Sequence, residues 1–461
     1  MFKTETYVQR RRVLKKQFKD GILLFLGNDD SPINYTDNMY HFRQDSTFLY
    51  YFGLENPGLY VVIDIDKNDE ILFGYDFTVD DIVWMGPQPS LQERAEQVGL
   101  KKSAAESELE HFLANALNKK RTVHILPPYR GEHKIKYASL LHLHVDGVEQ
   151  YVSEPFVKAV VAQRNIKSEQ EIVEIEKAID ITYEMQTFAM KNARPGLVER
   201  EISGKMEGIA AALGISTSFP IIFSVHGETL HNHDHGNTMR AGDIAINDCG
   251  AESISHYAGD ITRTIPIGGK FSARQKDIYE IVLTAEMSAI EIIRPGIPYK
   301  DIHLQIAKQM ADGLKQLGLL KGDMDDAVQQ GAHALFFPHG LGHMMGLDVH
   351  DMENLGEDYV GYDGTIERSS QFGLKSLRLG RALQPGFVLT VEPGLYFIPA
   401  LIEQWKANGM FASFINYDKL DAYLDFGGIR IEDDVLVTDS GARLLGRPIP
   451  KTVQDVEVLT C

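Results

Sequence analysis

The sequence predicts a protein of the mixed α/β (α+β) class, with an N-terminal α/β domain over residues 1–165 and a C-terminal domain over residues 166–461. Three observations support this prediction. The chain has 461 residues, which is more than one hydrophobic core usually serves. Its first third alternates short strand-like segments with helical ones, and the remainder repeats one order of elements twice. The repeat indicates an internal pseudo-two-fold duplication in the C-terminal domain.

The N-terminal domain is expected to contain a small sheet covered by helices. Short runs rich in aliphatic and β-branched residues predict four strands, at Gly21–Leu26, Leu59–Ile65, Glu70–Phe73 and Thr122–Leu126. A helix is predicted over Lys102–Lys119, because its apolar residues recur at helical spacing on a single face. We identify no cluster of metal ligands and no nucleophile in this domain, so we expect the chemistry to lie in the other one.

The C-terminal domain repeats a capped helix, the tripeptide Arg-Pro-Gly, and a second helix that ends in Leu-Gly. The first copy begins at Ser168, which forms a capping box with Glu171, and ends at Gly214. The second copy begins at Ser272 and ends at Gly318. Short matches of this kind also recur by chance, but the shared order of the elements favours a true duplication.

The duplication extends to two apolar strands, and each of them delivers an acid. Asp248 ends the run IAIND, Glu392 ends the run VLTVE, and both acids lie six positions after a glycine, Gly242 or Gly386. Acids at matching positions in two facing copies suit a site on the pseudo-two-fold axis.

Four acids in the C-terminal domain lie in or beside apolar, strand-like runs: Asp248, Asp260, Glu392 and Glu432. Any one of them alone would more simply be a surface acid or a member of a salt bridge. As a set they need a shared compensation, because burying a single unpaired charge costs roughly several kcal/mol. Cations supply that compensation, so the sequence predicts a metal site.

Three histidines occur in the glycine-rich run FFPHGLGHMMGLDVHD, namely His339, His343 and His350. The first two have the i, i+4 spacing of metal ligands on a helix, but Gly340 and Gly342 favour a loop. His343 and the four acids would give a ligand set of four carboxylates and one imidazole. This set favours Mn²⁺, Co²⁺, Fe²⁺ or Zn²⁺ over a thiolate-selected metal. Two such ions can together activate a water molecule and polarise a carbonyl group.

A second histidine cluster is the run HNHDH at His231–His235. On a strand its three histidines would share one face and could form an extra metal site. A polar loop is the simpler interpretation for His233 and His235.

Composition and charge limit the partners and the compartment. The formal net charge is −19, from 65 acidic and 46 basic residues, which disfavours nucleic acid. The segment MFKTETYVQRRR does not resemble a signal peptide and no run of about 18 apolar residues occurs, so no membrane contact is expected. The two cysteines are Cys249, expected in the core, and Cys461 at the end of the chain. This low number indicates a reducing compartment, and the cytoplasm is the expected location.

Several motifs together resemble the metallopeptidase family with the pita-bread fold, which includes methionine aminopeptidase, aminopeptidase P and prolidase. The run YHFRQDSTFLYYFGLENPG at 40–58 resembles the N-terminal domain shared by aminopeptidase P and prolidase. The runs HYAGDITRTIPIGGKFSARQKDIY, FPHGLGHMMGLDVHD, LTVEPGLY and GGIRIEDDV are similar to the family's metal and substrate motifs. The resemblance covers nearly the whole chain.

The resemblance implies two divalent metal ions, with Mn²⁺ favoured and Co²⁺, Zn²⁺ or Fe²⁺ left open. Its implied metal ligands are Asp248, Asp260, His343, Glu392 and Glu432, with Asp260 and Glu432 bridging both ions. It also implies roles in catalysis or in substrate binding for further residues, namely His231, His339, His350 and Arg430. Glu392 is additionally expected to carry protons from the attacking water to the leaving proline nitrogen.

One spacing departs from the family pattern. Asp248 and Asp260 are twelve positions apart, which is one more than in the family. The extra residue falls in GAESISHY, an expected hairpin turn, where a β-bulge would absorb it.

Two enzymes of this family remain as alternatives. The run GLKSLRLGRALQPGFVLTVEPGLYFIPALIEQW and the long insert before DFGGIRIEDD look more like prolidase, which cleaves Xaa-Pro dipeptides. In prolidase-like sequences an arginine at the position of Arg378 binds the carboxylate of the C-terminal proline. The runner-up is aminopeptidase P, which acts on longer peptides, and a non-catalytic binding module is a more remote alternative. The resemblance further implies small peptide substrates with proline at position 2, and a homodimer.

Overall fold

The protein is described here by a computed structural model, which covers residues 2–460 and leaves Cys461 outside the described residues. The described chain divides into two compact units. The first unit comprises the residues up to Arg164 together with Asn354–Tyr359. The second unit comprises Asn165–Glu353 and the chain from Val360 onward.

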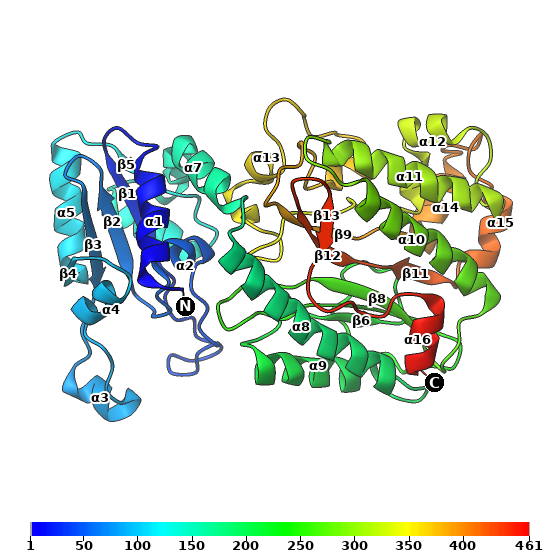
Figure 1. Ribbon diagram of the computed structural model, residues 1–461, viewed down its shortest axis with the longest axis horizontal. Coiled ribbons are helices and arrows are strands. Elements are labelled where there is room, and N and C mark those ends of the chain that lie inside the picture. Colours follow the sequence, from blue (N-terminus) through cyan, green and yellow to red (C-terminus); the bar gives the residue numbers. More distant parts are fainter. Residues whose placement is uncertain (1, 461) are drawn as a thin grey trace. The chain divides into compact units, whose positions relative to one another are not determined.

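The first unit contains one mixed sheet with helices around it (Figure 1). Its strands lie in the order β4-β3-β2-β1-β5. Apolar side chains of α5, such as Leu109 and Leu113, pack with Leu24 and Val62 of the sheet in one core. Its elements are α1 (Thr4–Lys15), β1 (Ile22–Leu26), α2 (Ser46–Phe52), β2 (Tyr60–Asp64), β3 (Asp69–Gly74), α3 (Val79–Met85), α4 (Leu91–Gln97), β4 (Lys102–Ala105), α5 (Glu106–Asn118), β5 (Val123–His124), α6 (Gly131–Leu140), η1 (Val145–Gly147), η2 (Glu149–Tyr151) and α7 (Glu154–Arg164).

Two predictions for this unit need correction. The helix predicted from Lys102 begins only at Glu106, because residues 102–105 form strand β4. That strand pairs in parallel with β3, from Ile71↔Lys102 onward, so the free edge of the sheet overrides the local helical pattern. Strand β5 covers only two of the five residues predicted at 122–126.

The second unit contains the predicted duplication. In each copy two long helices pack side by side, α8 with α9 and α10 with α11. Its helices and 3₁₀ turns are α8 (Glu169–Asn192), α9 (Glu199–Leu213), α10 (Ala273–Ile292), α11 (Tyr299–Gln316), α12 (Met324–Gln330), η3 (Ala332–Leu335), η5 (Leu374–Ser376), α14 (Pro399–Ala407), α15 (Tyr417–Leu420), η6 (Asp421–Tyr423) and α16 (Val453–Thr460). Two further short turns, η4 (Glu353–Leu355) and α13 (Glu357–Val360), lie where the chain passes between the units.

The expected helix starts are present in both copies. The Glu171 carboxylate accepts hydrogen bonds from the backbone N–H and the hydroxyl of Ser168, at 3.0 and 2.8 Å. The Gln275 side chain accepts the N–H of Ser272 at 2.8 Å. These contacts satisfy backbone groups that the first turn of a helix leaves without partners.

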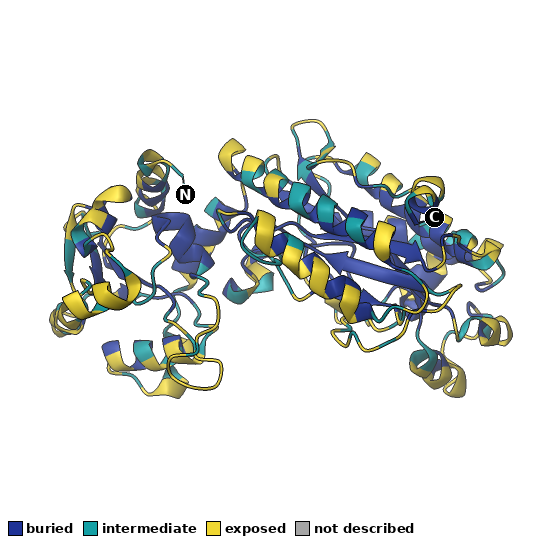
Figure 2. Cartoon of the chain, turned by 90° about the horizontal axis from the view of Figure 1, so that it is seen from below, coloured by how far each residue is buried: buried dark blue, intermediate teal, exposed yellow. Residues whose placement is uncertain are grey.

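The strands of the second unit form three small sheets, with orders β6-β7-β8, β13-β12-β9 and β10-β11. Apart from β13, the strands are largely buried, whereas the helices expose one face (Figure 2). The strands are β6 (Ile222–Ser224), β7 (Ile244–Cys249), β8 (Ile261–Pro266), β9 (Val388–Val391), β10 (Gly394–Phe397), β11 (Gly427–Arg430), β12 (Asp433–Val437) and β13 (Ala442–Leu444).

The strand register places two of the predicted acids opposite each other. Strand β9 pairs with β12 up to Asp433↔Val391, and β10 pairs with β11 from Gly394↔Arg430. The register is the same in both ladders. Glu392 and Glu432, which fill the gaps between these strands, therefore occupy opposed positions.

The hairpin that contains the extra residue has no bulge, so that expectation was wrong. Strands β7 and β8 pair up to Cys249↔Ile261, and the isolated bridge Glu252↔Ala258 continues the same register. The extra residue therefore lies in the closing turn, residues 253–257, where His256 has a positive φ of 66°. Asp248 and Asp260 are not shifted relative to each other.

In the part of the chain that the structure describes, no helix is both long enough and apolar enough to cross a lipid bilayer.

Candidate active site

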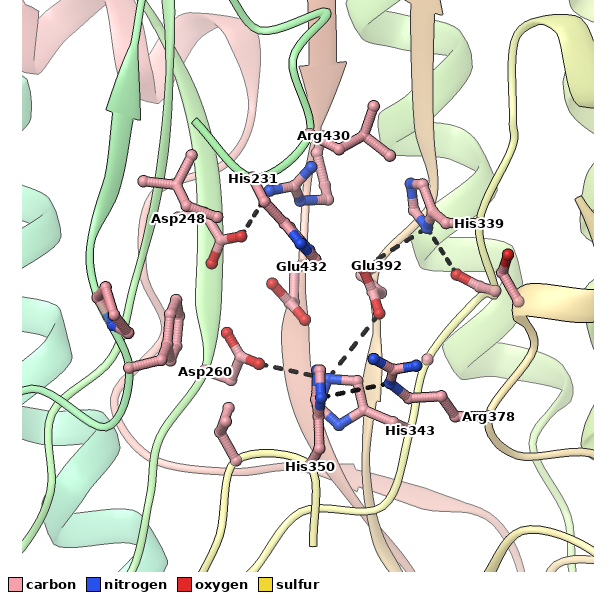
Figure 3. A pocket seen from close by; sticks show the side chains of 18 of the residues that line it. His231, Asp248, Asp260, His339, His343, His350, Arg378, Glu392, Arg430 and Glu432 are labelled. Carbon is pink, nitrogen blue, oxygen red and sulfur yellow. Dashed lines mark hydrogen bonds and ion pairs between the residues drawn. The ribbon is translucent and has the colours of Figure 1, made fainter. Parts of the chain in front are cut away.

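One cavity of the second unit, of about 540 Å³, collects the residues that the sequence singled out. All ten predicted site residues line it (Figure 3). They are His231, Asp248, Asp260, His339, His343, His350, Arg378, Glu392, Arg430 and Glu432. The volume lies in the usual range for sites that take small molecules.

Three of these side chains could hold a cation without rearrangement. Ligand atoms of Asp260, His343 and Glu432 all lie within 4.8 Å of one another, and the three residues are buried. The Nδ1–H of His343 donates to the carbonyl oxygen of Met344 at 3.1 Å. That bond leaves the lone pair on Nε2, and neutral imidazole is the form that binds metals. Nε2 lies 3.4 Å from Oδ2 of Asp260, so the lone pair is next to another predicted ligand.

The other two predicted ligands border this cluster. Glu392 Oε1 lies 3.9 Å from His343 Nε2. One oxygen of Asp248, Oδ2, accepts a hydrogen bond from Nη2 of Arg430. The other oxygen, Oδ1, is buried and has no hydrogen-bond partner among the described residues. An orphaned carboxylate oxygen beside three grouped ligands fits a bound cation.

The electrostatics of the cluster also fit a cation. Burial, and then repulsion from neighbouring carboxylates, raises the pKa of Asp260 and of Glu432 well above their usual values. Burial raises the pKa of Glu392 to about 8, although Arg430 opposes the shift. Burial also lowers the pKa of His343 well below its usual value. Divalent cations offset this repulsion, and a set rich in oxygen with one imidazole suits the metals predicted from the sequence.

A chain of hydrogen bonds runs along one wall of the cavity. Arg430 Nη1 donates to the hydroxyl of Tyr396 at 2.7 Å, and this hydroxyl lies 2.8 Å from His339 Nε2. His339 Nδ1 lies 2.8 Å from the Gly340 carbonyl oxygen and must donate to it, so Nε2 accepts from Tyr396. Burial lowers the pKa of His339 to about 3, which keeps its ring neutral.

The opposite side of the cavity joins His350 to Arg378. The rings of His343 and His350 meet edge to face, with centroids 4.3 Å apart. Arg378 Nε lies 3.3 Å from His350 Nδ1. Both side chains are about one-third exposed, so they lie at the wall of the cavity and are not in the core.

The histidine run at 231–235 is a loop, as the simpler interpretation expected. His231 and His233 line the cavity, whereas His235 contacts the carbonyl oxygen of Ile221 and the hydroxyl of Ser203. Partial burial, and then the nearby Arg430, lowers the pKa of His231. The three histidines do not share a face, so they form no additional metal site of the kind that a strand would give.

Four residues that the sequence analysis did not single out contribute to the site. Tyr396 bridges Arg430 and His339, as described above. Thr262 donates to Glu432 Oε2 at 2.7 Å, and the Asp434 carboxylate accepts the backbone N–H of Asp260 at 3.0 Å. Glu353 contacts His350 and is treated below. Tyr396 lies four positions after Glu392, and Asp434 lies two positions after Glu432. This proximity to predicted ligands could have indicated from the sequence that they belong to the site.

The comparisons with known proteins agree with this site. The model for Metallopeptidase family M24 matches residues 173–439, and the model for the aminopeptidase P N-terminal domain matches residues 7–125. The chain therefore belongs to Metallopeptidase family M24. The match over residues 173–439 spans every residue of the candidate site.

Particular relatives are similar over almost their whole length. The Xaa-Pro dipeptidase of Homo sapiens is 32% identical, over 95% of this chain and 88% of its own. The Xaa-Pro aminopeptidase of Escherichia coli K12 is 31% identical, over 99% and 97%. The solved structure of aminopeptidase P from E. coli with the inhibitor Pro-Leu matches with a TM-score of 0.81 at 30% identity, over 100% of this chain and 98% of that one. Another solved structure is a zinc-substituted form of the E. coli enzyme with product, which has the same TM-score and identity.

Proposed function

We propose that this metallopeptidase hydrolyses the bond between an N-terminal residue and a following proline, and that Xaa-Pro dipeptides are its preferred substrates. The observation that carries the proposal is the single cavity in which four acids and His343 lie beside His231, His339, His350 and Arg378. The names of the relatives, Xaa-Pro dipeptidase and Xaa-Pro aminopeptidase, support the reaction. We assign residues 1–165 to the N-terminal domain and residues 166–461 to the catalytic domain.

The residues that we propose would hold two divalent ions are Asp248, Asp260, His343, Glu392 and Glu432. Mn²⁺ is favoured, with Co²⁺, Zn²⁺ or Fe²⁺ as alternatives. When bound, such ions supply an activated water and polarise the scissile carbonyl.

The protein's own groups would move the proton and stabilise developing charge. Glu392 borders the metal cluster, and we propose that it takes a proton from the attacking water and returns it to the leaving proline nitrogen. His231 and His350 line the cavity, and we propose that they contact the substrate or the oxyanion that forms during attack. His339 is held by Tyr396 in one tautomer, so its ring can position the substrate without a change of charge.

Arg378 is proposed to bind the carboxylate of a C-terminal proline. Its position in the cavity wall supports this role over that of a solvated surface charge. A guanidinium holds a carboxylate through two parallel hydrogen bonds, and a longer peptide offers a neutral amide at the same place. The alternative is aminopeptidase P activity on longer peptides, which the similarity to the E. coli enzyme favours.

The test is the rate of hydrolysis of Ala-Pro and of Ala-Pro-Ala by the metal-loaded protein and by its Arg378→Ala variant. We expect the wild type to prefer the dipeptide. The variant should lose about tenfold or more of kcat/KM on the dipeptide and little on the tripeptide. Preference of the wild type for the tripeptide would assign aminopeptidase P activity. No hydrolysis of either substrate in the presence of Mn²⁺, Co²⁺ or Zn²⁺ would favour a non-catalytic binding module.

We also propose that the protein is a homodimer, located in the cytoplasm. Helix α3 stands away from the sheet of its own unit (Figure 1), and none of its residues is buried. It nevertheless presents Val79, Val83 and Trp84 to solvent, with Trp84 86% exposed. Exposed apolar clusters of this kind mark interaction surfaces. Light scattering should show a dimer that Trp84→Ser weakens, whereas Ile135→Ser, at another exposed apolar position of the same unit, should have no effect.

A further inference from the structure

Glu353 lies beside His350 and Arg378, the two proposed substrate-binding residues on one side of the cavity. Its Oε2 atom is 2.6 Å from Nδ1 of His350 and 3.6 Å from Nη2 of Arg378. The carboxylate is ionised, because its hydrogen bond with His350, and then the charge of Arg378, lowers its pKa. The Arg368 guanidinium also acts on it from a distance.

The short contact fixes how these groups share their protons. A carboxylate oxygen at 2.6 Å requires the proton on Nδ1 of His350, so this nitrogen donates to Glu353. An Nδ1 that carries a proton cannot accept from Arg378, although Nε of Arg378 lies 3.3 Å away. The charge pairing of Arg378 with Glu353 therefore contributes to holding Arg378 beside His350.

The position of Glu353 is set by a local turn. Its backbone N–H donates to the carbonyl oxygen of His350 at 3.2 Å, and Met352 between them has a positive φ of 60°. The turn brings the carboxylate to the imidazole three residues earlier. A glutamine at this position can keep the geometry and lose only the charge.

We propose that Glu353 moderates the preference of the enzyme for substrate length by pairing with Arg378. This proposal rests on the proposed function, because it assumes that Arg378 meets the end of the substrate. When a longer peptide presents a neutral amide, Arg378 still has the Glu353 carboxylate as an anionic partner. This reduces the free-energy cost of binding the longer peptide. When a dipeptide presents a carboxylate, Glu353 competes with it for the same guanidinium. Glu353 therefore moderates the selectivity for dipeptides that Arg378 creates.

The expected size of the effect of Glu353 on substrate preference follows from the solvent exposure of Glu353 and Arg378. The side chains of Arg378 and Glu353 are 30% and 44% exposed, so water and salt screen their interaction. Pairs of this kind alter equilibria by about two- to fivefold. Loss of the charge in Glu353→Gln should therefore raise the ratio of kcat/KM for Ala-Pro over that for Ala-Pro-Ala by about two- to fivefold.

The experiment measures this ratio in the full-length, metal-loaded protein for four forms: wild type, Glu353→Gln, Arg378→Ala and the double variant. Any loss caused by poorer orientation of His350 affects both substrates and cancels in the ratio. We expect Glu353→Gln to raise the ratio only when Arg378 is present. Glu367→Gln, which removes an exposed acid at another place in the same unit, serves as the matched control and should leave the ratio unchanged.

A second measurement separates this proposal from the proposed function. Calorimetry compares the binding of proline and of prolinamide to the same four forms, and it needs no turnover. We expect Glu353→Gln to favour proline over prolinamide by about two- to fivefold, again only with Arg378 present. An unchanged preference, or an equal change without Arg378, overturns the role of Glu353. Absence of hydrolysis of both peptides overturns the proposed function instead, and the binding preference still decides the role of Glu353.

Discussion

A buried ion pair supports the loop that carries His343 and His350, and its removal is our most detailed prediction. Lys167 Nζ lies 2.7 Å from Asp351 Oδ2, and both side chains are only 1% exposed. Lys167 precedes helix α8, and Asp351 directly follows His350. Gly346 lies against the pair, since a Cβ atom there would come within 2.6 Å of the Asp351 carboxylate.

The expected magnitude follows from this burial. Lys167→Met leaves the Asp351 carboxylate in a protein interior without the ammonium group, at a cost of about 3–5 kcal/mol. For a unit of this size, that cost lowers the melting temperature by roughly 5–15 °C. The double variant Lys167→Met/Asp351→Leu removes both charges, so it should be more stable than Lys167→Met alone. This recovery distinguishes a lost ion pair from simple loss of packing.

Calorimetric unfolding of the wild type, Lys167→Met, Asp351→Leu and the double variant gives the coupling energy between Lys167 and Asp351 directly. Lys308→Met is the matched control, because the Lys308–Asp312 pair has a similar distance of 2.8 Å but exposed side chains. It should change stability far less than Lys167→Met does, because water and salt screen exposed pairs. A loss of stability in Lys167→Met no larger than that in Lys308→Met would refute the reasoning.

Four further predictions concern the site and its surroundings. Metal uptake should release protons and strengthen as pH rises from about 6 to 8, because the raised pKa values of Asp260, Glu432 and Glu392 keep protons on these carboxyls until a metal displaces them. Titration calorimetry in buffers of different ionisation enthalpy measures this proton release. A binding heat that does not depend on the buffer would contradict the prediction. Glu432→Ala should lose stoichiometric metal, measured by elemental analysis, together with activity, so full activity in this variant would exclude the proposed ligand set. His350→Ala should lower kcat by on the order of 10²-fold at normal metal content, and loss of metal would make it a ligand. Finally, burial lowers the pKa of His303 to about 3, and its ring nitrogens have no hydrogen-bond partners among the described residues. The stability that its neutral form contributes is present above about pH 6.5 and is lost as pH falls. His303→Phe should therefore unfold less readily than the wild type at pH 4–5, and equal acid sensitivity of the two proteins would disprove this.

Local sequence determined much of this protein. Ser168 with Glu171 and Ser272 with Gln275 begin long helices because capping depends on residues three positions apart. The glycines around His343 favoured a loop, and the structure has one, because they disfavour a helix locally. The family motifs located the ten residues proposed from the sequence, but not Tyr396, Thr262, Asp434 or Glu353. The helix caps and the loop depend on contacts within a few residues of one another, so a single sequence contains them.

Tertiary structure alone decided the features that depend on distant parts of the chain. Residues 102–105 form a strand because an edge of β3 is available, which no local pattern records. Glu392 faces Glu432 because the two ladders between their strands share one register. Glu353 reaches Arg378 across 25 positions of sequence because a turn at His350 and the fold of the later loop bring both side chains to one wall of the cavity. Pairing of this kind depends on packing and register, which the complete fold fixes and short stretches of sequence do not.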